Sequence, residues 1–267
     1  MRQLRFRRMR RIGLVVFAIG LVGCFAAPTP SGPAFSSIDP PWAGRALTRD
    51  GSDTYSLAGS ATVSAAASNS GGNTRTVWWD DSQNALTDEQ SCATWVSETN
   101  AIDQQGAALR ITNDRAITVT KNIYFYATWI FIVHIWDTSN PDFGTQLASF
   151  DLGSVFRPDG SNVVALPWDL CARVTGATLT FIAWVDGQSQ PTWGDASHGG
   201  TVTLPDGWVY QGSAGFYTGH LQPADQAVYS NLAAGPISNT PMPTGATHTE
   251  TVSPSAGPPP KYPPTYP

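Results

Sequence analysis

The chain has 267 residues, of which 41% are hydrophobic and only 13% are charged, and its formal net charge is −5. An acidic chain lacks the basic surface that binding to nucleic-acid phosphates requires, so we expect no nucleic-acid partner. Ten tryptophans and 25 glycines, with no long helical repeat of Ala, Glu, Lys and Leu, predict an all-β domain rich in turns.

Residues 1–23 have the composition of a secretory signal peptide. Six arginines and no acidic residue precede a short apolar run, residues 12–22, which is shorter than a membrane-spanning helix. Removing this segment leaves nine basic against 20 acidic residues, a formal charge of −11. We therefore expect an exported, acidic mature protein.

The apolar run ends in LVGC, residues 21–24. This stretch resembles the lipobox of bacterial lipoproteins. The resemblance implies cleavage before Cys24, acylation of its thiol, and a membrane contact through the lipid on the outer face of the cell membrane or in the cell envelope. Two alternatives remain: ordinary signal cleavage after Ala26 or Ala27, which discards Cys24, and an uncleaved anchor.

Cys92 and Cys171 are the other two cysteines of the chain. If Cys24 carries lipid, they form an even pair, and an exported protein resides where disulfides persist. Both lie in apolar, strand-like surroundings beside Trp95 and Trp168. We predict a Cys92–Cys171 disulfide; the alternative is two buried free thiols.

Composition divides the rest of the chain into three parts. Residues 24–53 read as a flexible linker, and residues 236–267 as a disordered Pro-rich tail with a protein of the envelope as its expected partner. Between them, residues 54–235 are predicted to form one β-sandwich. Its expected strands lie within residues 74–80, 106–111, 116–121, 123–137, 146–152, 161–168, 170–176, 177–187, 200–205, 215–221 and 227–232.

Two of these segments leave alternatives open. Residues 57–73 are small and polar, and they form either one edge strand or a continuation of the linker. Residues 123–137 are apolar at nearly every position, so we expect them to be covered on both faces. Their length predicts either a bend near Ala127-Thr128 or one long strand.

The stretch LCARVTGATLTFIAWVDGQSQPTW, residues 170–193, resembles hairpins of the concanavalin A-like lectin and glucanase superfamily. GFYTGHL and AVYSNL resemble the closing strands of those domains. The resemblance spans residues 75–232 in strand order and implies an antiparallel jelly-roll sandwich. That superfamily contains lectins, binding modules, hydrolases and lyases, so the resemblance does not select a function.

The catalytic patterns of the superfamily are mostly missing here. Glu89 and Glu98 are the only glutamates of the predicted domain, and they do not form the glucanase pair, so an enzyme is not the leading expectation. The lyases of the superfamily use Arg, Gln, His and Tyr. Their scheme makes His134, Tyr217 and Arg110 the first catalytic candidates, with His220 in the same GFYTGHL stretch as Tyr217. The competing interpretation of His134 is a hydrogen-bonded core residue.

Residues 136–144, WDTSNPDFG, loosely resemble the calcium loop of legume lectins. Asp137, Asn140 and Asp142 offer the oxygen ligands that calcium prefers. The competing interpretation, which we favour, is a turn in which Asp137 and Asn140 bond their own backbone. No other cofactor is expected.

Alternation along TLTFIAWVD, residues 178–186, sets Leu179, Phe181, Ala183 and Val185 on one face and Trp184 and Asp186 on the other. If the first face is core, the second is available to a sugar. The predicted ligand-binding set is Trp184, Trp193, Trp208 and Asp186, and the alternative is that these tryptophans pack inside. The leading functional hypothesis is glycan binding at the cell envelope, followed by polysaccharide cleavage and by a noncatalytic scaffold.

Overall fold

The computed structural model describes residues 42–59, 61–138 and 144–242. Cys24, Asn140 and Asp142 lie outside the described residues, so their predicted roles are not addressed by it. Across the described ranges, no helix has both the length and the apolar character needed to cross a bilayer.

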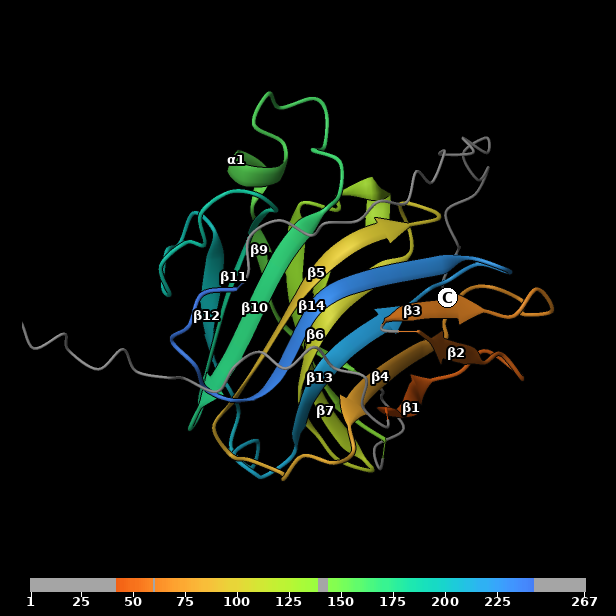
Figure 1. Ribbon diagram of the computed structural model, residues 1–267, viewed down its shortest axis with the longest axis horizontal. Helices are drawn as coiled ribbons and strands as arrows, with labels where there is room; N and C mark the ends of the chain where they lie inside the picture. Colours follow the sequence, from red (N-terminus) through yellow and green to blue (C-terminus); the bar gives the residue numbers. More distant parts are fainter. Residues whose placement is uncertain (1–41, 60, 139–143, 243–267) are drawn as a thin grey trace, which may run out of the picture. The chain divides into compact units, whose positions relative to one another are not determined.

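Within these three ranges, fourteen strands form two antiparallel sheets of seven strands each. Sheet A contains, in spatial order, β1 (Trp42–Thr48), β4 (Arg75–Asp80), β13 (Ser213–Gly219), β6 (Gln104–Ile111), β7 (Arg115–Lys121), β8 (Ile130–Asp137) and β9 (Thr145–Asp151). Sheet B contains β12 (Gly199–Thr203), β11 (Thr178–Val185), β10 (Trp168–Thr175), β5 (Glu89–Glu98), β14 (Gln226–Pro236), β3 (Thr62–Ala65) and β2 (Tyr55–Ala58), and its middle strands lie side by side in Figure 1. The predicted all-β, antiparallel sandwich is confirmed.

The core between the sheets is built from every second residue of each strand, as strand alternation requires. At its centre Phe131 stacks on Trp95, Phe156 and Phe181, at centroid distances of 5.7, 5.5 and 5.9 Å. Rings of this size bury a large apolar area each, so this stack joins the two sheets. The face of β11 predicted to be core, which carries Leu179, Phe181 and Ala183, does lie inside.

The disulfide is present, joining neighbouring strands of sheet B. Cys92 on β5 and Cys171 on β10 are directly opposed in the strand register, with their Cα atoms 4.1 Å apart. The prediction of this pair from the cysteine count is confirmed.

The sandwich begins earlier than the expected start at residue 54. Residues 42–48 form the edge strand β1 instead of a linker, because Trp42 packs edge-to-face on Phe216 at 5.1 Å. Arg45 adds hydrogen bonds to the carbonyls of Thr112 and Arg115, at 2.6 and 2.8 Å. Residues 57–73 contribute parts of the hairpin β2–β3 at the edge of sheet B.

Residues 123–137 are bent, as one of the two alternatives predicted. The short 3-10 helix η1 (Tyr124–Tyr126) precedes β8, which starts at Ile130. The expectation that the whole segment is covered is wrong, because Tyr124, Phe125 and Tyr126 are exposed. Residues 161–168 were also predicted as a strand, but only Trp168 belongs to one. The one α-helix among the described residues, α1 (Gly153–Phe156), lies shortly before this loop.

Candidate functional site

The face of sheet A that points away from the core has a floor of very small residues on its two central strands. They are Gly106 and Ala108 on β6 and Gly215 and Gly219 on β13. A Cβ at position 106 would come within 2.6 Å of the Val119 carbonyl, and one at position 219 within 2.4 Å of the Tyr217 hydroxyl. The floor therefore leaves room for flat rings to lie across the strands.

Tyr217 lies on this floor and is tied to the neighbouring strand. Its hydroxyl donates a 2.6 Å hydrogen bond to Oε1 of Gln104. The amide nitrogen of Gln104 in turn donates to the Lys121 carbonyl at 2.8 Å and to the Thr120 hydroxyl at 3.2 Å. The network joins β13, β6 and β7, and a fully paired buried network of this kind fixes its side chains in one arrangement.

Trp136 of β8 occupies the space between Tyr217 and His134. Its ring lies 6.5 Å from Tyr217, nearly parallel to it, and 5.5 Å from the imidazole of His134. Its indole N–H donates to the Thr118 hydroxyl at 2.9 Å, and the guanidinium of Arg75 lies 5.4 Å from the ring centre. Aromatic and cationic groups thus share one surface.

We call Arg75, Gln104, His134, Tyr217 and His220 the polar cluster.

Both histidines of the polar cluster are neutral at pH 7. Burial, together with the positive charge of Arg75, lowers the pKa of His134 to about 4 and that of His220 to about 3. Nδ1 of His134 is buried and has no hydrogen-bond partner among the described residues. Burial raises the pKa of Tyr217, with Arg75 opposing, so its hydroxyl stays protonated.

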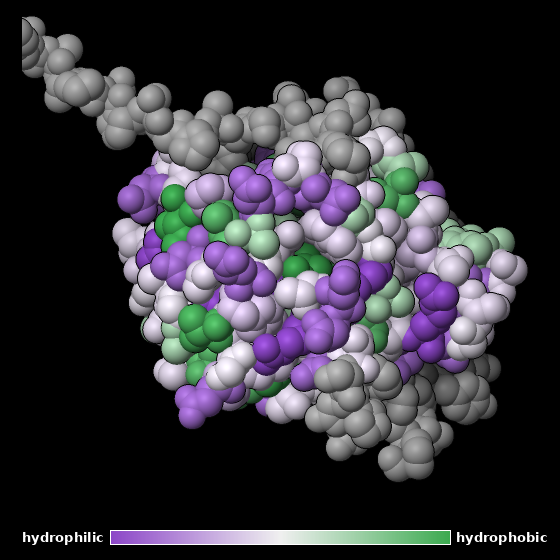
Figure 2. Space-filling view, turned by 90° about the horizontal axis from the view of Figure 1, so that it is seen from below, coloured by the Kyte–Doolittle hydropathy of each residue, from purple (hydrophilic) through white to green (hydrophobic). Residues whose placement is uncertain are grey.

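The polar cluster is reached from its rim. Tyr217, Gln104 and His220 are buried, whereas Arg75 and His134 are half-buried, as is Trp79 of β4 on the same face. On the face of the molecule drawn in Figure 2, hydrophobic residues form separate small patches among hydrophilic ones. Because their side chains are only half-buried, Arg75, His134 and Trp79 are the groups of the outer face of sheet A best placed to meet a ligand.

Of the three predicted catalytic residues, the structure brings two together. His134 and Tyr217 share the outer face of sheet A, with Trp136 between them and Gln104 as the hydrogen-bond partner of Tyr217. The placement of Arg110 with them is wrong. Its side chain is fully buried and donates to the carbonyls of Thr87, Trp208 and Gly176, because β6 bulges there and Arg110 adopts a φ of 48°.

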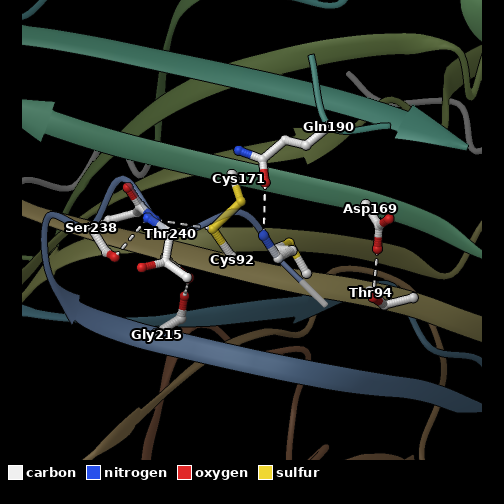
Figure 3. The surroundings of a disulfide bond; sticks show 11 residues. Cys92, Thr94, Asp169, Cys171, Gln190, Gly215, Ser238 and Thr240 are labelled. Carbon is white, nitrogen blue, oxygen red and sulfur yellow. Dashed lines mark hydrogen bonds between the residues drawn. A yellow bond between two sulfur atoms is a disulfide. The ribbon is translucent and has the colours of Figure 1, made fainter. Parts of the chain in front are cut away.

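The predicted sugar-binding tryptophan of β11 is inaccessible. Trp184 does lie on the face opposite the core, as its alternation predicts, yet only 1% of it is exposed. It packs with the disulfide, Ile182 and Met242, whose backbone N–H donates to Gln190 at 2.8 Å. Figure 3 shows the disulfide with Gln190, Ser238 and Thr240 around it. Residues that follow β14 thus cover this face, which alternation within one strand cannot reveal.

The other members of that set are scattered. Trp193 is half-buried in the loop before β12, and the guanidinium of Arg173 lies 4.1 Å from its ring. Asp186 follows β11 and lies near Asp169, whose pKa is raised to about 7 by burial, with a smaller contribution from Asp186. Trp208 does not border a groove with Trp184: it packs into the core between the sheets, with Arg115 4.1 Å from its ring.

No metal site is apparent in the described part of the chain. There, no three His, Cys, Asp or Glu residues are grouped in a way that could hold an ion. Asp137 lies 4.0 Å from the guanidinium of Arg115. The other two predicted calcium ligands lie outside the described residues, as noted above.

Arg75, Gln104 and Trp136 were missed by the sequence analysis as site residues. A signal for them exists in strand alternation: Arg75, Val77 and Trp79 share one face of β4, and Gln104 precedes the small Gly106 and Ala108 on the same face of β6. What no single strand discloses is that these faces belong to adjacent strands.

Neither a protein-family model nor a curated protein sequence matches the chain. Solved structures with a similar chain path include the carbohydrate-binding module CBM66 from Bacillus subtilis, with a TM-score of 0.43 and 6% identity over 72% of this chain and 94% of that one. A protein of unknown function with a galectin-like fold, also from Bacillus subtilis, has a TM-score of 0.43 and 10% identity over 73% and 88%. The VIP36 exoplasmic/lumenal domain, bound to Ca2+ and Man3GlcNAc, has a TM-score of 0.39 and 12% identity over 75% and 86%.

Proposed function

We propose that the protein is exported, anchored by lipid at Cys24, and binds carbohydrate at the cell envelope through the outer face of sheet A. The observation that carries the binding proposal is that half-buried Arg75, His134 and Trp79 lie on the same sheet face as the buried Tyr217–Gln104 network. Aromatic faces suit the C–H faces of pyranose rings, and a few fixed polar groups suit their hydroxyls.

The binding proposal is tested by probing a glycan array with the full chain and with two matched variants. Arg75 and Arg173 each lie over a tryptophan, at 5.4 and 4.1 Å, but on different sheets. We expect Arg75→Ala to weaken glycan binding at least tenfold and Arg173→Ala to change it less than twofold. The reverse result would move the site to sheet B, and a chain that binds no glycan would end the proposal.

Export and lipid anchoring are supported by the arginine-rich leader and the LVGC stretch. The test is mass spectrometry of the mature N-terminus, together with fractionation of cells that produce Cys24→Ser. We expect a diacylglycerol-modified N-terminal cysteine and release of the variant from the membrane fraction. An unmodified N-terminus beyond residue 24 would contradict the anchor.

Polysaccharide cleavage is the second candidate function, and one observation favours it. Arg75, Gln104, His134 and Tyr217 lie on one face, which provides a cation, a neutral imidazole and a protonated phenol. In a β-elimination, His134 would accept the proton next to the uronate carboxylate and Tyr217 would protonate the leaving oxygen.

The test for cleavage is incubation with a panel of polyuronates, followed by ultraviolet detection of unsaturated ends. If cleavage occurs, Tyr217→Phe abolishes it and leaves binding in place, because the phenol ring remains and only the proton donor is lost. If no polyuronate is cleaved while the array shows binding, the protein is a binding module.

A further inference from the structure

Three consecutive aromatic side chains project from the turn between β7 and β8. Tyr124, Phe125 and Tyr126 are 50, 92 and 49% exposed, and Val209 is the only other large hydrophobic residue that is exposed in the described part of the chain. Leaving aromatic surface in water costs free energy that a buried position would avoid. Such a cluster on an otherwise mixed surface marks a site of interaction.

The turn holds these rings outward. Phe125 and Tyr126 have φ values of 55 and 56°, a left-handed conformation that bulky residues rarely adopt. Asn122 fixes the turn: its side-chain oxygen accepts from the Tyr124 N–H at 3.1 Å and its amide nitrogen donates to the Tyr124 carbonyl at 3.0 Å. The rings are therefore presented on a braced backbone, which reduces the ordering cost of binding.

The aromatic turn adjoins the polar cluster. It connects the strand that carries Thr118 and Thr120 to the strand that carries His134 and Trp136. The side-chain amide of Gln104 donates to the Lys121 carbonyl at 2.8 Å, and Lys121 directly precedes Asn122, the residue that fixes the turn. The turn and the cluster therefore form parts of one surface.

We propose that the aromatic turn is a second stacking subsite for the same glycan, so that the ligand is an extended polysaccharide chain rather than a mono- or disaccharide. This inference rests on the proposed function. Sugar rings bound at the cluster would continue toward Tyr124 and Phe125, where aromatic faces receive their C–H faces and the tyrosine hydroxyls lie within reach of the ring substituents.

Two other occupants fit less well. An anionic membrane surface needs exposed basic residues beside the rings, whereas the adjacent Lys121 is 1% exposed and paired with Glu98. A second copy of the chain needs about 800 Å² from each partner, far more than three side chains provide.

The test is calorimetric titration of the full chain with oligosaccharides of two and six residues, from β-1,4-linked glucose, xylose, mannose and uronate series. We expect Phe125→Ala to weaken binding of the preferred six-residue ligand at least fivefold and to leave the two-residue ligand unchanged. The matched control is Val209→Ala, which removes an exposed hydrophobic side chain elsewhere and should change neither affinity.

Each other outcome contradicts the inference in a distinguishable way. Equal binding of the longer ligand by Phe125→Ala and the unchanged chain overturns the second subsite and leaves the proposed function intact. Failure of the unchanged chain to bind any oligosaccharide overturns both. Co-sedimentation of the unchanged chain, but not of Phe125→Ala, with vesicles of phosphatidylglycerol and phosphatidylethanolamine assigns the turn to a membrane instead.

Discussion

The hydroxyl of Tyr217 on β13 donates a 2.6 Å hydrogen bond to the side chain of Gln104 on the neighbouring strand β6. Both residues are buried on the outer face of sheet A, outside the core. The bond is possible because position 219 is a glycine, whose missing Cβ makes room for the phenol oxygen. On this outer face of sheet A, where side chains ordinarily meet water, a buried hydrogen bond instead fixes the two side chains.

Tyr217→Phe is predicted to lower the free energy of unfolding by about 1–2 kcal/mol. The substitution removes the donor and leaves Oε1 of buried Gln104 without its partner, which costs more than the hydrogen bond alone. Urea unfolding measures the loss. Tyr126→Phe is the control, because that ring is 49% exposed, and its stability should remain within about 0.5 kcal/mol. Equal stability of Tyr217→Phe and the unchanged chain would contradict the role of this bond.

Arg110→Ala is predicted to lower the free energy of unfolding by about 3 kcal/mol. The guanidinium donates to the carbonyls of Thr87 and Gly176, at 2.8 and 2.6 Å, and lies beside buried Glu89. Its truncation therefore leaves these buried polar groups without a partner. The free energy of unfolding is measured by chemical denaturation for Arg110→Ala and for the control Arg49→Ala. Arg49 is exposed, so its substitution is expected to change stability little. Similar losses in both variants would show that Arg110 is not a structural clamp.

Removing the disulfide by Cys92→Ser with Cys171→Ser is predicted to cost about 4 kcal/mol. The bond closes a loop with a sequence separation of 79 residues, and long loops restrict the unfolded chain most. Urea midpoints of the oxidised chain, the reduced chain and the double variant give the comparison. We expect the reduced chain and the double variant to coincide; a double variant as stable as the oxidised chain would refute the prediction.

Stability is predicted to fall as the pH rises from 5 to 9, in part because of Asp103. Burial raises the pKa of this carboxyl to about 9, and Asp225 adds to the effect. The folded chain therefore keeps a proton that the unfolded chain releases near pH 4, and the contribution to stability declines by at most about 1.4 kcal/mol per pH unit until pH 9. The free energy of unfolding, measured at pH 5, 7 and 9, should decline less steeply with pH for Asp103→Asn than for the unchanged chain. The same slope in both proteins would contradict this.

Trp184→Phe is predicted to lower stability by about 1–2 kcal/mol and to leave glycan affinity unchanged. The indole is buried against the disulfide and Met242, so a smaller ring leaves a gap. Its N–H has no hydrogen-bond partner among the described residues, so no bond is lost. Chemical denaturation of Trp184→Phe tests the predicted loss of stability, and glycan-array binding of the same variant tests the unchanged affinity. Loss of binding without loss of stability would return the site to sheet B.

Local pattern was sufficient for much of the fold. The alternation of β11 identified its core face, and the pairing of Cys92 with Cys171 followed from the cysteine count once Cys24 was assigned to lipidation. The first feature depends on side-chain spacing within one segment, and the second on the number of cysteines in the chain. The edge strand β1 was mistaken for linker because what holds it is the contact of Trp42 with Phe216, distant in sequence.

By itself, the sequence determined an antiparallel sandwich and the disulfide, and it named His134 and Tyr217 as candidates without placing them on one sheet face. Only the tertiary structure decided which tryptophans are buried, that Arg110 binds backbone carbonyls, and that Arg75 and Gln104 join the cluster. The physical reason is that alternation fixes the side of a strand on which a residue lies. Exposure and partnership depend on which strands become neighbours and which segments fold over them.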